Sequence, residues 1–164
     1  MVVNLCLILF QSFPENILVI SSGLVLTGLR PRLPKIIIIA AITSVISHIV
    51  RALPLAPGLH IILQFPVLVM LVTCFYKLNI TYAILASSIG VIGITLCEMI
   101  LNPILSLVTG IPIKEVLKDP FWRFVFPIPE FILMAILVYF LFRKRITLFD
   151  VQEFENLEHV ENHE

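Results

Sequence analysis

The chain has 164 residues, 59% of them hydrophobic, and its mean hydropathy is +1.06. A soluble domain is nearer to half apolar and cannot hide that much apolar surface in one small core. Apolar runs of about 20 residues recur along the chain, which is typical of a multi-pass membrane protein. We therefore expect an all-α bundle of membrane-spanning helices.

The formal net charge of zero conceals two oppositely charged parts. The segment 150–164 holds six acidic residues and neither lysine nor arginine, whereas the rest holds all 11 basic residues and five acidic ones. This division predicts an apolar lead-in over 1–13 that is interfacial or half inserted, a transmembrane bundle over 14–145, and an acidic cytoplasmic tail over 146–164. Such an acidic tail is typically solvated, although it could also form a helix that docks on a soluble partner.

Five apolar segments predict the spanning helices in chain order, at 14–29, 35–53, 58–78, 79–108 and 121–142. Proline- and glycine-rich stretches separate most of them, as expected of turns. The lead-in would add a sixth span if it crossed the bilayer. As a helix, the 12 residues 2–13 reach only about 18 Å, short of a ~30 Å hydrocarbon core.

Loop charges set the expected orientation, because cytoplasmic loops are enriched in lysine and arginine. A cytoplasmic C-terminus after five spans places seven basic residues inside: Arg30, Arg32, Lys35, Lys77, Arg143, Lys144 and Arg145. Only four basic residues remain outside. We therefore predict a multi-pass cell-membrane protein with its N-terminus outside and its C-terminus in the cytoplasm.

Two spans begin with the same dipeptide, Pro14-Glu15 and Pro129-Glu130. Proline suits the first helical turn, and a carboxylate there faces the positive end of the helix dipole. One interpretation is therefore two ordinary helix starts. The other follows from depth, because at ~1.5 Å per residue both carboxylates lie only about 20 Å from the inner helix ends, below the outer surface of the bilayer.

Other polar residues fall at a similar level on the remaining spans. Such residues within a membrane usually face the bundle interior or a water-filled cavity. The alternative is a solvated position at the interface. The candidate ligand-binding residues are Glu15, His48, Arg51, His60, Gln64, Glu98 and Glu130.

Two stripes of small residues predict which spans meet, because small residues four apart allow close helix approach. We expect the second span to pack on the fourth and to bring Arg51 or His48 close to Glu98. The stripes are Ala40, Ser44, Ser47 and Arg51 on the second span, and Ala83, Ser87, Gly90 and Cys97, with Glu98 at its edge, on the fourth.

The chain carries no recognisable catalytic or nucleotide-binding motif. Its cysteines, Cys6, Cys74 and Cys97, lie in apolar runs without ligand spacing. We therefore expect no catalytic residue, no cofactor, no metal and no nucleic-acid partner.

Three stretches carry a resemblance to a known family: "LFQSFPENILVISSGLVLTGLRP", "RALPLAPGLHIILQ" and "EMILNPILSLVTGIPIKEVLKDPFWRFVFPIPEFILMAILVYFLFRKR". They resemble the N-terminal membrane-sensing domain of Gram-positive GHKL-type sensor histidine kinases, of the accessory-gene-regulator class. The resemblance implies a bacterial sensor in a two-component signal-transduction system. The kinase domain of that family would follow "RKR", where this chain has only its acidic tail, so no catalytic residue carries over.

These observations predict a non-enzymatic membrane sensing or signalling module that binds its ligand or partner through the outer polar layer. A small transporter or transporter subunit could use the same residues as a substrate or proton site. A membrane anchor for a cytoplasmic protein is a third alternative. The expected partners are the lipid bilayer, a second copy of the chain or a signalling protein, and a small or peptide ligand.

Overall fold

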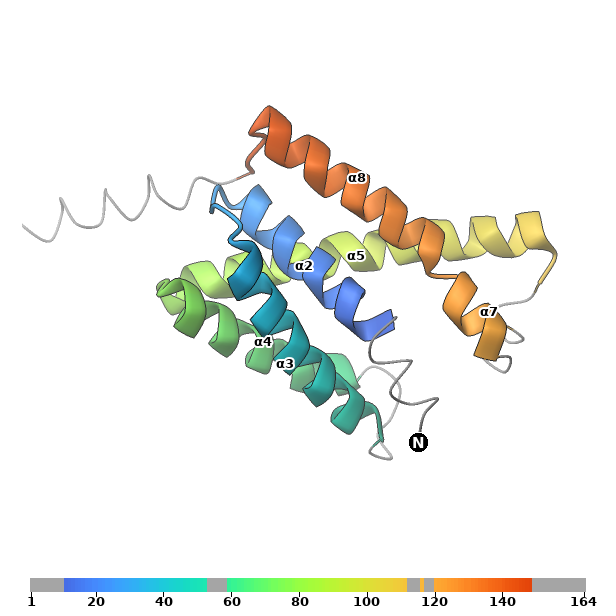
Figure 1. Ribbon diagram of the computed structural model, residues 1–164, viewed down its shortest axis with the longest axis horizontal. Helices are drawn as coiled ribbons and strands as arrows, with labels where there is room; N and C mark the ends of the chain where they lie inside the picture. The colour runs from blue at the N-terminus through green and yellow to red at the C-terminus, as the bar shows by residue number, and fades with distance from the viewer. Residues whose placement is uncertain (1–10, 53–58, 112–115, 117–119, 149–164) are drawn as a thin grey trace, which may run out of the picture.

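The computed structural model describes residues 11–52, 59–111, 116 and 120–148, and these residues are entirely helical apart from their turns. The helices are α2 (Phe13–Leu26), α3 (Leu33–Ala52), α4 (Leu59–Tyr76), α5 (Ile80–Thr109), α7 (Pro120–Val125) and α8 (Ile128–Lys144), shown in Figure 1. The predicted all-α class is confirmed. The lead-in before residue 11 and the tail beyond residue 148 lie outside the described residues.

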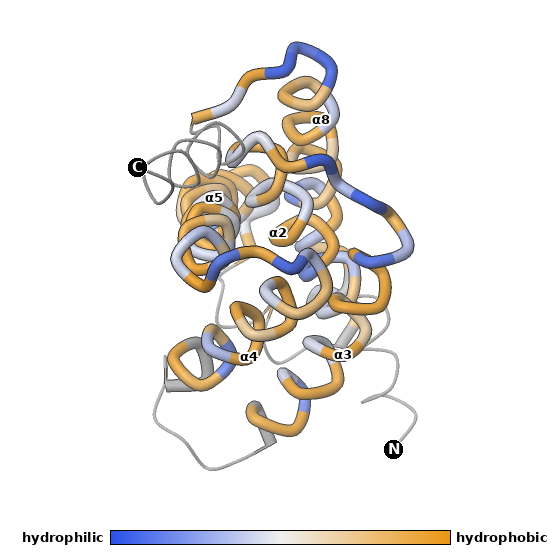
Figure 2. Tube along the Cα trace, turned by 90° about the vertical axis from the view of Figure 1, so that its left-hand side faces the viewer, coloured by the Kyte–Doolittle hydropathy of each residue, from blue (hydrophilic) through white to orange (hydrophobic). Residues whose placement is uncertain are grey.

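Helix α2 is the centre of the bundle. It packs on α3, α5 and α8, and α4 bridges α3 and α5. Figure 2 shows α2 in the middle, with α8 above it, α5 to one side and α3 and α4 below. Eight of its 14 residues are buried, so the shortest of the five expected spans contributes the most continuous core surface.

Helix ends follow from local sequence. Beyond α2, Gly28 has a φ of 74°, the N–H of Leu29 donates to Leu24 O, and the N–H of Gly28 donates to Val25 O. This is a Schellman motif, in which glycine is favoured because it adopts positive φ without a steric cost. At the other end of the chain, the expected single span over 121–142 is two helices, α7 and α8, separated before the prolines Pro127 and Pro129.

The backbones of α2 and α5 approach unusually closely. A Cβ atom added to Gly23 of α2 would lie 2.1 Å from the carbonyl oxygen of Ala86, and one added to Gly90 of α5 would lie 2.2 Å from that of Val19. Both distances are far below van der Waals contact. Each helix therefore supplies one glycine against a backbone carbonyl of the other.

The prediction that the second span, α3, packs on the fourth, α5, is wrong, because both helices pack on α2. Asn16 of α2 donates from Nδ2 to Ser44 Oγ of α3 at 3.1 Å, while Gly90 of α5 meets Val19 of α2. Helices α3 and α5 are not among the pairs in substantial contact. Each small-residue stripe therefore meets α2, through Ser44 on α3 and through Gly90 on α5.

Seven basic residues lie at one end of the bundle, which we call the basic end. The N–H of Arg32 donates to Tyr76 Oη at 3.1 Å, and Lys35 Nζ donates to the carbonyl of Phe75, which brings the α2–α3 turn to the end of α4. The N–H of Leu148 donates to Leu26 O at 2.7 Å, which brings the residues after α8 to the same place. The basic end comprises Arg30, Arg32, Lys35, Lys77, Arg143, Lys144 and Arg145.

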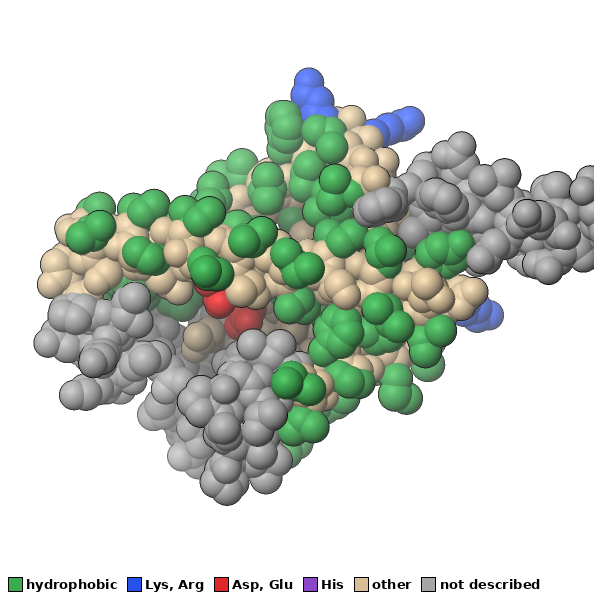
Figure 3. Space-filling view, turned by 180° about the vertical axis from the view of Figure 1, so that it is seen from behind, with side chains coloured by type: hydrophobic (Ala, Val, Ile, Leu, Met, Phe, Trp, Pro, Cys, Tyr) green, Lys and Arg blue, Asp and Glu red, His purple; other side chains and the backbone are tan. Residues whose placement is uncertain are grey.

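Two helical segments of the described chain are long and apolar enough to cross a membrane, Leu33–Val50 and Ile80–Thr109. The apolar helices Phe13–Leu26 and Ile62–Tyr76 are shorter. Large apolar side chains are exposed along α3, α5 and α8, and Figure 3 shows them covering much of one face. This pattern is compatible with a membrane environment for the bundle.

Candidate functional site

Three acidic residues converge away from the basic end. Glu15, Glu98 and Glu130 are the acidic residues of the described chain, and they come from α2, α5 and α8. Glu15 and Glu98 both act electrostatically on Glu130, which is only 5% exposed. Figure 3 shows acidic side chains within a hollow of an otherwise apolar face. Residues up to 115 positions apart in the sequence thus form one acidic cluster.

A cavity of about 230 Å³ lies beside this cluster, between α2, α4 and α5. One part of its wall is polar and the other part is apolar. The polar lining residues are Glu15, Asn16, Gln64, Thr95 and Glu98, and the apolar ones are Val19, Phe65, Leu68, Val91 and Ile94. Mixed walls of this kind are typical of small-molecule sites, where apolar surface gives affinity and a few polar groups give orientation.

Helical spacing explains how α5 builds its part of the wall. Val91, Ile94, Thr95 and Glu98 are separated by three and four residues, so they share one face of the helix. On α4, Gln64 and Leu68 are likewise one turn apart. Each helix thus presents a polar residue one turn from an apolar one, which produces a wall that changes polarity along its length.

The position of Glu15 is fixed by its neighbour. Asn16 is buried and donates from Nδ2 to the carbonyl oxygen of Ser12 at 2.7 Å and to Ser44 Oγ at 3.1 Å. These two bonds tie the first turn of α2 to α3. Because α2 is held at this point, Glu15 faces the cavity, where its carboxylate also lies in the positive field of the helix start.

Glu130 is the most buried member of the acidic cluster. Its Oε1 atom has no hydrogen-bond partner. One turn further along α8, Met134 is fully buried and accepts a weak hydrogen bond from Cys97 Sγ of α5, with the two sulfur atoms 3.3 Å apart. Glu130 and Met134 are the buried residues of α8, so this helix contacts the bundle through a narrow strip.

The structure brings together four of the seven candidate residues. Glu15, Gln64 and Glu98 line the cavity, and Glu130 lies beside two of them. His48 is half-buried on α3 and is not among the lining residues. The side chains of Arg51 and His60 lie outside the described residues, so the predicted approach of Arg51 to Glu98 stays a prediction.

Two polar lining residues were missed in the sequence. Asn16 directly follows Glu15, and Thr95 precedes Glu98 by three positions, which places it on the same helical face. Either spacing could have identified them. Across the described residues, no three histidine, cysteine, aspartate or glutamate side chains are grouped so that they could hold a metal ion.

The chain matches no protein-family model, no curated protein and no solved structure.

Proposed function

We propose that the chain is a multi-pass bacterial cell-membrane protein in which α2, α3, α4, α5 and α8 form five spans. The exposed apolar faces of α3, α5 and α8 support a lipid environment, because soluble proteins rarely expose such patches. Helix α5 has 30 residues, about 45 Å, which exceeds a ~30 Å core and favours a tilted span. Helix α2 reaches only about 21 Å, but its neighbours cover it on most sides, so lipid need not match its length.

The proposed orientation puts the basic end in the cytoplasm and the N-terminus outside. Seven basic residues gathered at one end support it, because positive residues favour the cytoplasmic side. In a background without Cys6, Cys74 and Cys97, a cysteine replacing Thr147 should resist a membrane-impermeant thiol reagent in intact cells. A cysteine replacing Ile113 should react. The opposite labelling pattern would reverse the orientation.

The function that this geometry supports best is a non-enzymatic sensing module that binds a small ligand in the cavity. The observation that carries the proposal is the lining of the cavity by Glu15, Gln64 and Glu98, which come from three helices. Carboxylates favour a cationic group, and the wall formed by Val91, Ile94 and Leu68 favours an apolar one. We therefore infer a ligand that combines an amine-like cation with an apolar portion.

Helix α8 is the element that would report ligand binding. Glu130 on α8 interacts electrostatically with Glu15 and Glu98, so a cation bound beside those two carboxylates changes the field at α8. The narrow buried strip of α8 lets it shift at a small cost in packing. Because α8 leads to the basic end and the C-terminal segment, its movement would carry the signal across the membrane, as the resemblance to sensor-kinase membrane domains implies.

A matched pair of probes tests the site. Butylammonium should raise the Tm of the purified protein in neutral detergent, and 1-butanol, which lacks the charge, should raise it much less. Glu98→Gln should abolish the difference between the two probes, whereas Glu164→Gln, which removes the same charge from the tail, should preserve it. Equal responses to both probes, or a preserved difference in Glu98→Gln, would contradict the proposal.

Cation- or proton-coupled transport is the second candidate. The buried Oε1 of Glu130, which has no hydrogen-bond partner, favours it, because buried carboxyls in membrane bundles commonly carry protons. Reconstituted vesicles separate the two functions. Uptake of butylammonium that depends on Glu130 would identify a transporter, whereas binding without uptake would support the sensing module.

A further inference from the structure

Among the described residues, the basic end gathers positive charge that no acidic residue offsets; the six acidic residues of 150–164 follow it in the sequence. All three acidic residues of the described chain lie in the cluster at Glu15, Glu98 and Glu130, so the basic end has no acidic residue among those described. Of its seven basic residues, six are exposed and Lys35 is half-buried. The charges come from three separate places in the sequence, and the fold brings these to one end of the bundle. They are the turn after α2 with the first residues of α3, the turn after α4, and the last turn of α8 with Arg145.

Two of these residues occupy positions where the backbone favours glycine. Lys77 and Arg145 have φ values of 54° and 52°, and they are the non-glycine residues with positive φ in the described chain. At Arg145 the N–H groups of Ile146 and Arg145 donate to the carbonyls of Leu141 and Phe142, which is the hydrogen-bond pattern of a Schellman motif. Gly28 fills the equivalent position after α2. The chain thus keeps a cationic side chain at two turns where glycine would be unstrained.

Aromatic rings lie beside the charges at the same level. Lys35 Nζ is 5.0 Å from the centroid of the Tyr76 ring, and Lys144 Nζ is 6.0 Å from that of Phe140. Arg143 Nη1 donates to Tyr139 Oη at 2.9 Å. Tyrosine together with lysine and arginine is the combination that anchors membrane proteins at the level of the lipid headgroups.

We propose that the basic end is a binding surface for anionic phospholipid headgroups of the cytoplasmic leaflet. The proposal rests on the membrane location proposed above, but not on the ligand cavity. Clustered lysine and arginine residues at a membrane surface attract anionic lipids, and basic pockets between helices bind their headgroups. The split origin of the cluster has a structural consequence, because headgroups bound along it would reinforce the connection between the end of α2 and the residues after α8, which the Leu148 N–H to Leu26 O hydrogen bond already makes.

A double variant that should fold as stably as the parent tests the proposal. Lys77→Gly combined with Arg145→Gly removes two charges and also relieves both positive φ angles, so its Tm in neutral detergent without lipid should be at least that of the parent. Its affinity for phosphatidylglycerol should nevertheless fall, by roughly fivefold for each charge removed. Lys77→Arg combined with Arg145→Lys keeps both charges and should retain the parent affinity.

The measurement is the Tm of the full chain in neutral detergent micelles, titrated with phosphatidylglycerol, phosphatidylcholine or inorganic phosphate. Phosphatidylglycerol should raise the Tm of the parent, and high salt should weaken the rise. Phosphatidylcholine should have a much smaller effect. Equal effects of the two lipids, an unchanged affinity in the glycine double variant, or an inorganic phosphate effect as large as that of phosphatidylglycerol would each overturn the proposal. A chain that stayed soluble without detergent would instead refute the membrane location.

Discussion

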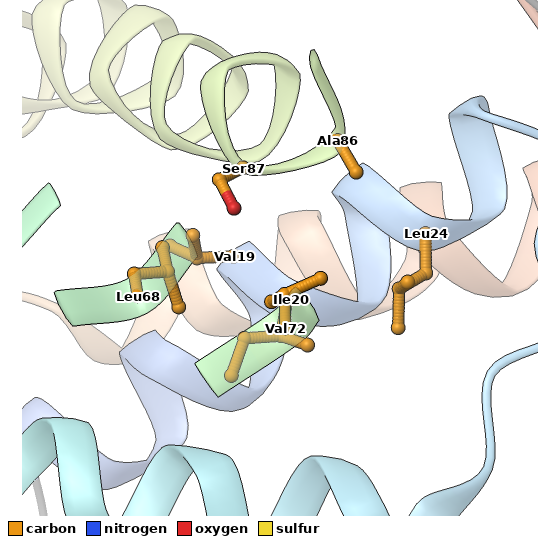
Figure 4. A pocket seen from close by; sticks show the side chains of 7 residues that line it. All are labelled: Val19, Ile20, Leu24, Leu68, Val72, Ala86 and Ser87. Atoms are coloured by element: carbon orange, nitrogen blue, oxygen red, sulfur yellow. The ribbon is translucent and has the colours of Figure 1, made fainter. Parts of the chain in front are cut away.

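The same three helices, α2, α4 and α5, meet in two very different ways along their length. Near the middle, Val19, Ile20 and Leu24 of α2 line, together with residues of α4 and α5, a pocket that is too narrow to admit a water molecule. Figure 4 shows these side chains, with the Ser87 hydroxyl pointing among them. About one turn towards the start of α2, the helices diverge around a cavity of about 230 Å³. Val19 and Leu68 line both regions, so the change occurs within one helical turn.

The difference follows from the size and polarity of a few side chains. In the closed region, glycine and alanine let the backbones of α2 and α5 touch, and aliphatic side chains of α4 fill what is left. In the open region, Glu15, Gln64 and Glu98 replace those aliphatic groups, and charged or amide groups are costly to pack against one another without water or a ligand. The closed region therefore acts as the rigid support, and the open region is where binding can occur.

The largest expected effect comes from removing the close approach of α2 and α5. Gly23→Ala or Gly90→Ala would place a methyl group about 2 Å from a backbone carbonyl oxygen that cannot move independently of its helix. We expect the free energy of unfolding to fall by about 3 kcal/mol or more, because overpacking against backbone forces the helices apart. Thermal unfolding in detergent measures the loss.

Gly93 provides the matched control on the same helix, because a Cβ atom added there would meet no atom within 4 Å. Gly93→Ala should be neutral or stabilising by up to about 1 kcal/mol, the difference in helix propensity between the two residues. A similar loss in Gly93→Ala and Gly90→Ala would mean that the α2–α5 contact does not hold the bundle together.

Helix positions were largely predictable from the sequence. The expected segments 35–53, 58–78 and 79–108 correspond closely to α3, α4 and α5, because prolines, glycines and polar turns act locally. The level of Glu15, Glu98 and Glu130 along their helices could also be counted from the rise per residue. Five spans stay a prediction, since two helical segments meet the length and hydropathy expected of a crossing.

Helix pairing could not be predicted in the same way. The small-residue stripes on α3 and α5 correctly indicated close contacts, but a stripe does not specify which helix fills it. Both are filled by α2, whose run of Ser21, Ser22 and Gly23 was the available sequence signal. Rotation of each helix about its axis depends on all its neighbours at once, so the sequence alone did not show which helical faces would line the cavity, although Asn16 directly follows Glu15 and Thr95 is spaced from Glu98 as a residue of the same face.

The second largest loss of stability is expected from changing Asn16, which lies at the boundary between the closed and open regions. Asn16→Ala removes two buried hydrogen bonds, to Ser12 O and Ser44 Oγ, and should destabilise the protein by about 2 kcal/mol. It should also weaken butylammonium binding, because Glu15 loses its fixed position. Asn79→Ala is the control, since Asn79 is exposed and makes no side-chain cap hydrogen bond. Equal Tm losses in the two variants would show that the hydrogen bonds of Asn16 do not stabilise the bundle.

The acidic cluster should respond in opposite directions to changes in its charge. Glu130→Gln keeps the shape of the side chain but removes a carboxyl that is 5% exposed and whose Oε1 has no hydrogen-bond partner, so it should raise stability. Gln64→Glu adds a carboxylate to the cavity wall and should lower stability there. Thermal unfolding of both variants in low and high salt provides the test. Shifts of the same sign would show that packing, and not charge, determines stability in the open region.

The smallest expected change in stability comes from replacing Ser87 in the closed region. Ser87 Oγ is buried there and has no hydrogen-bond partner, so its hydroxyl lost water on folding and gained nothing in return. Ser87→Ala should therefore leave stability unchanged or raise it by up to about 1 kcal/mol. Ser44→Ala should lower it by a similar amount, because Ser44 Oγ donates to Ala40 O and accepts from Asn16. Both serines are almost fully buried, so the two changes remove the same group from equally dry places and differ only in its hydrogen bonds. A destabilising Ser87→Ala, measured as a fall in Tm, would mean that the closed region depends on a polar contact and is not held by close packing alone.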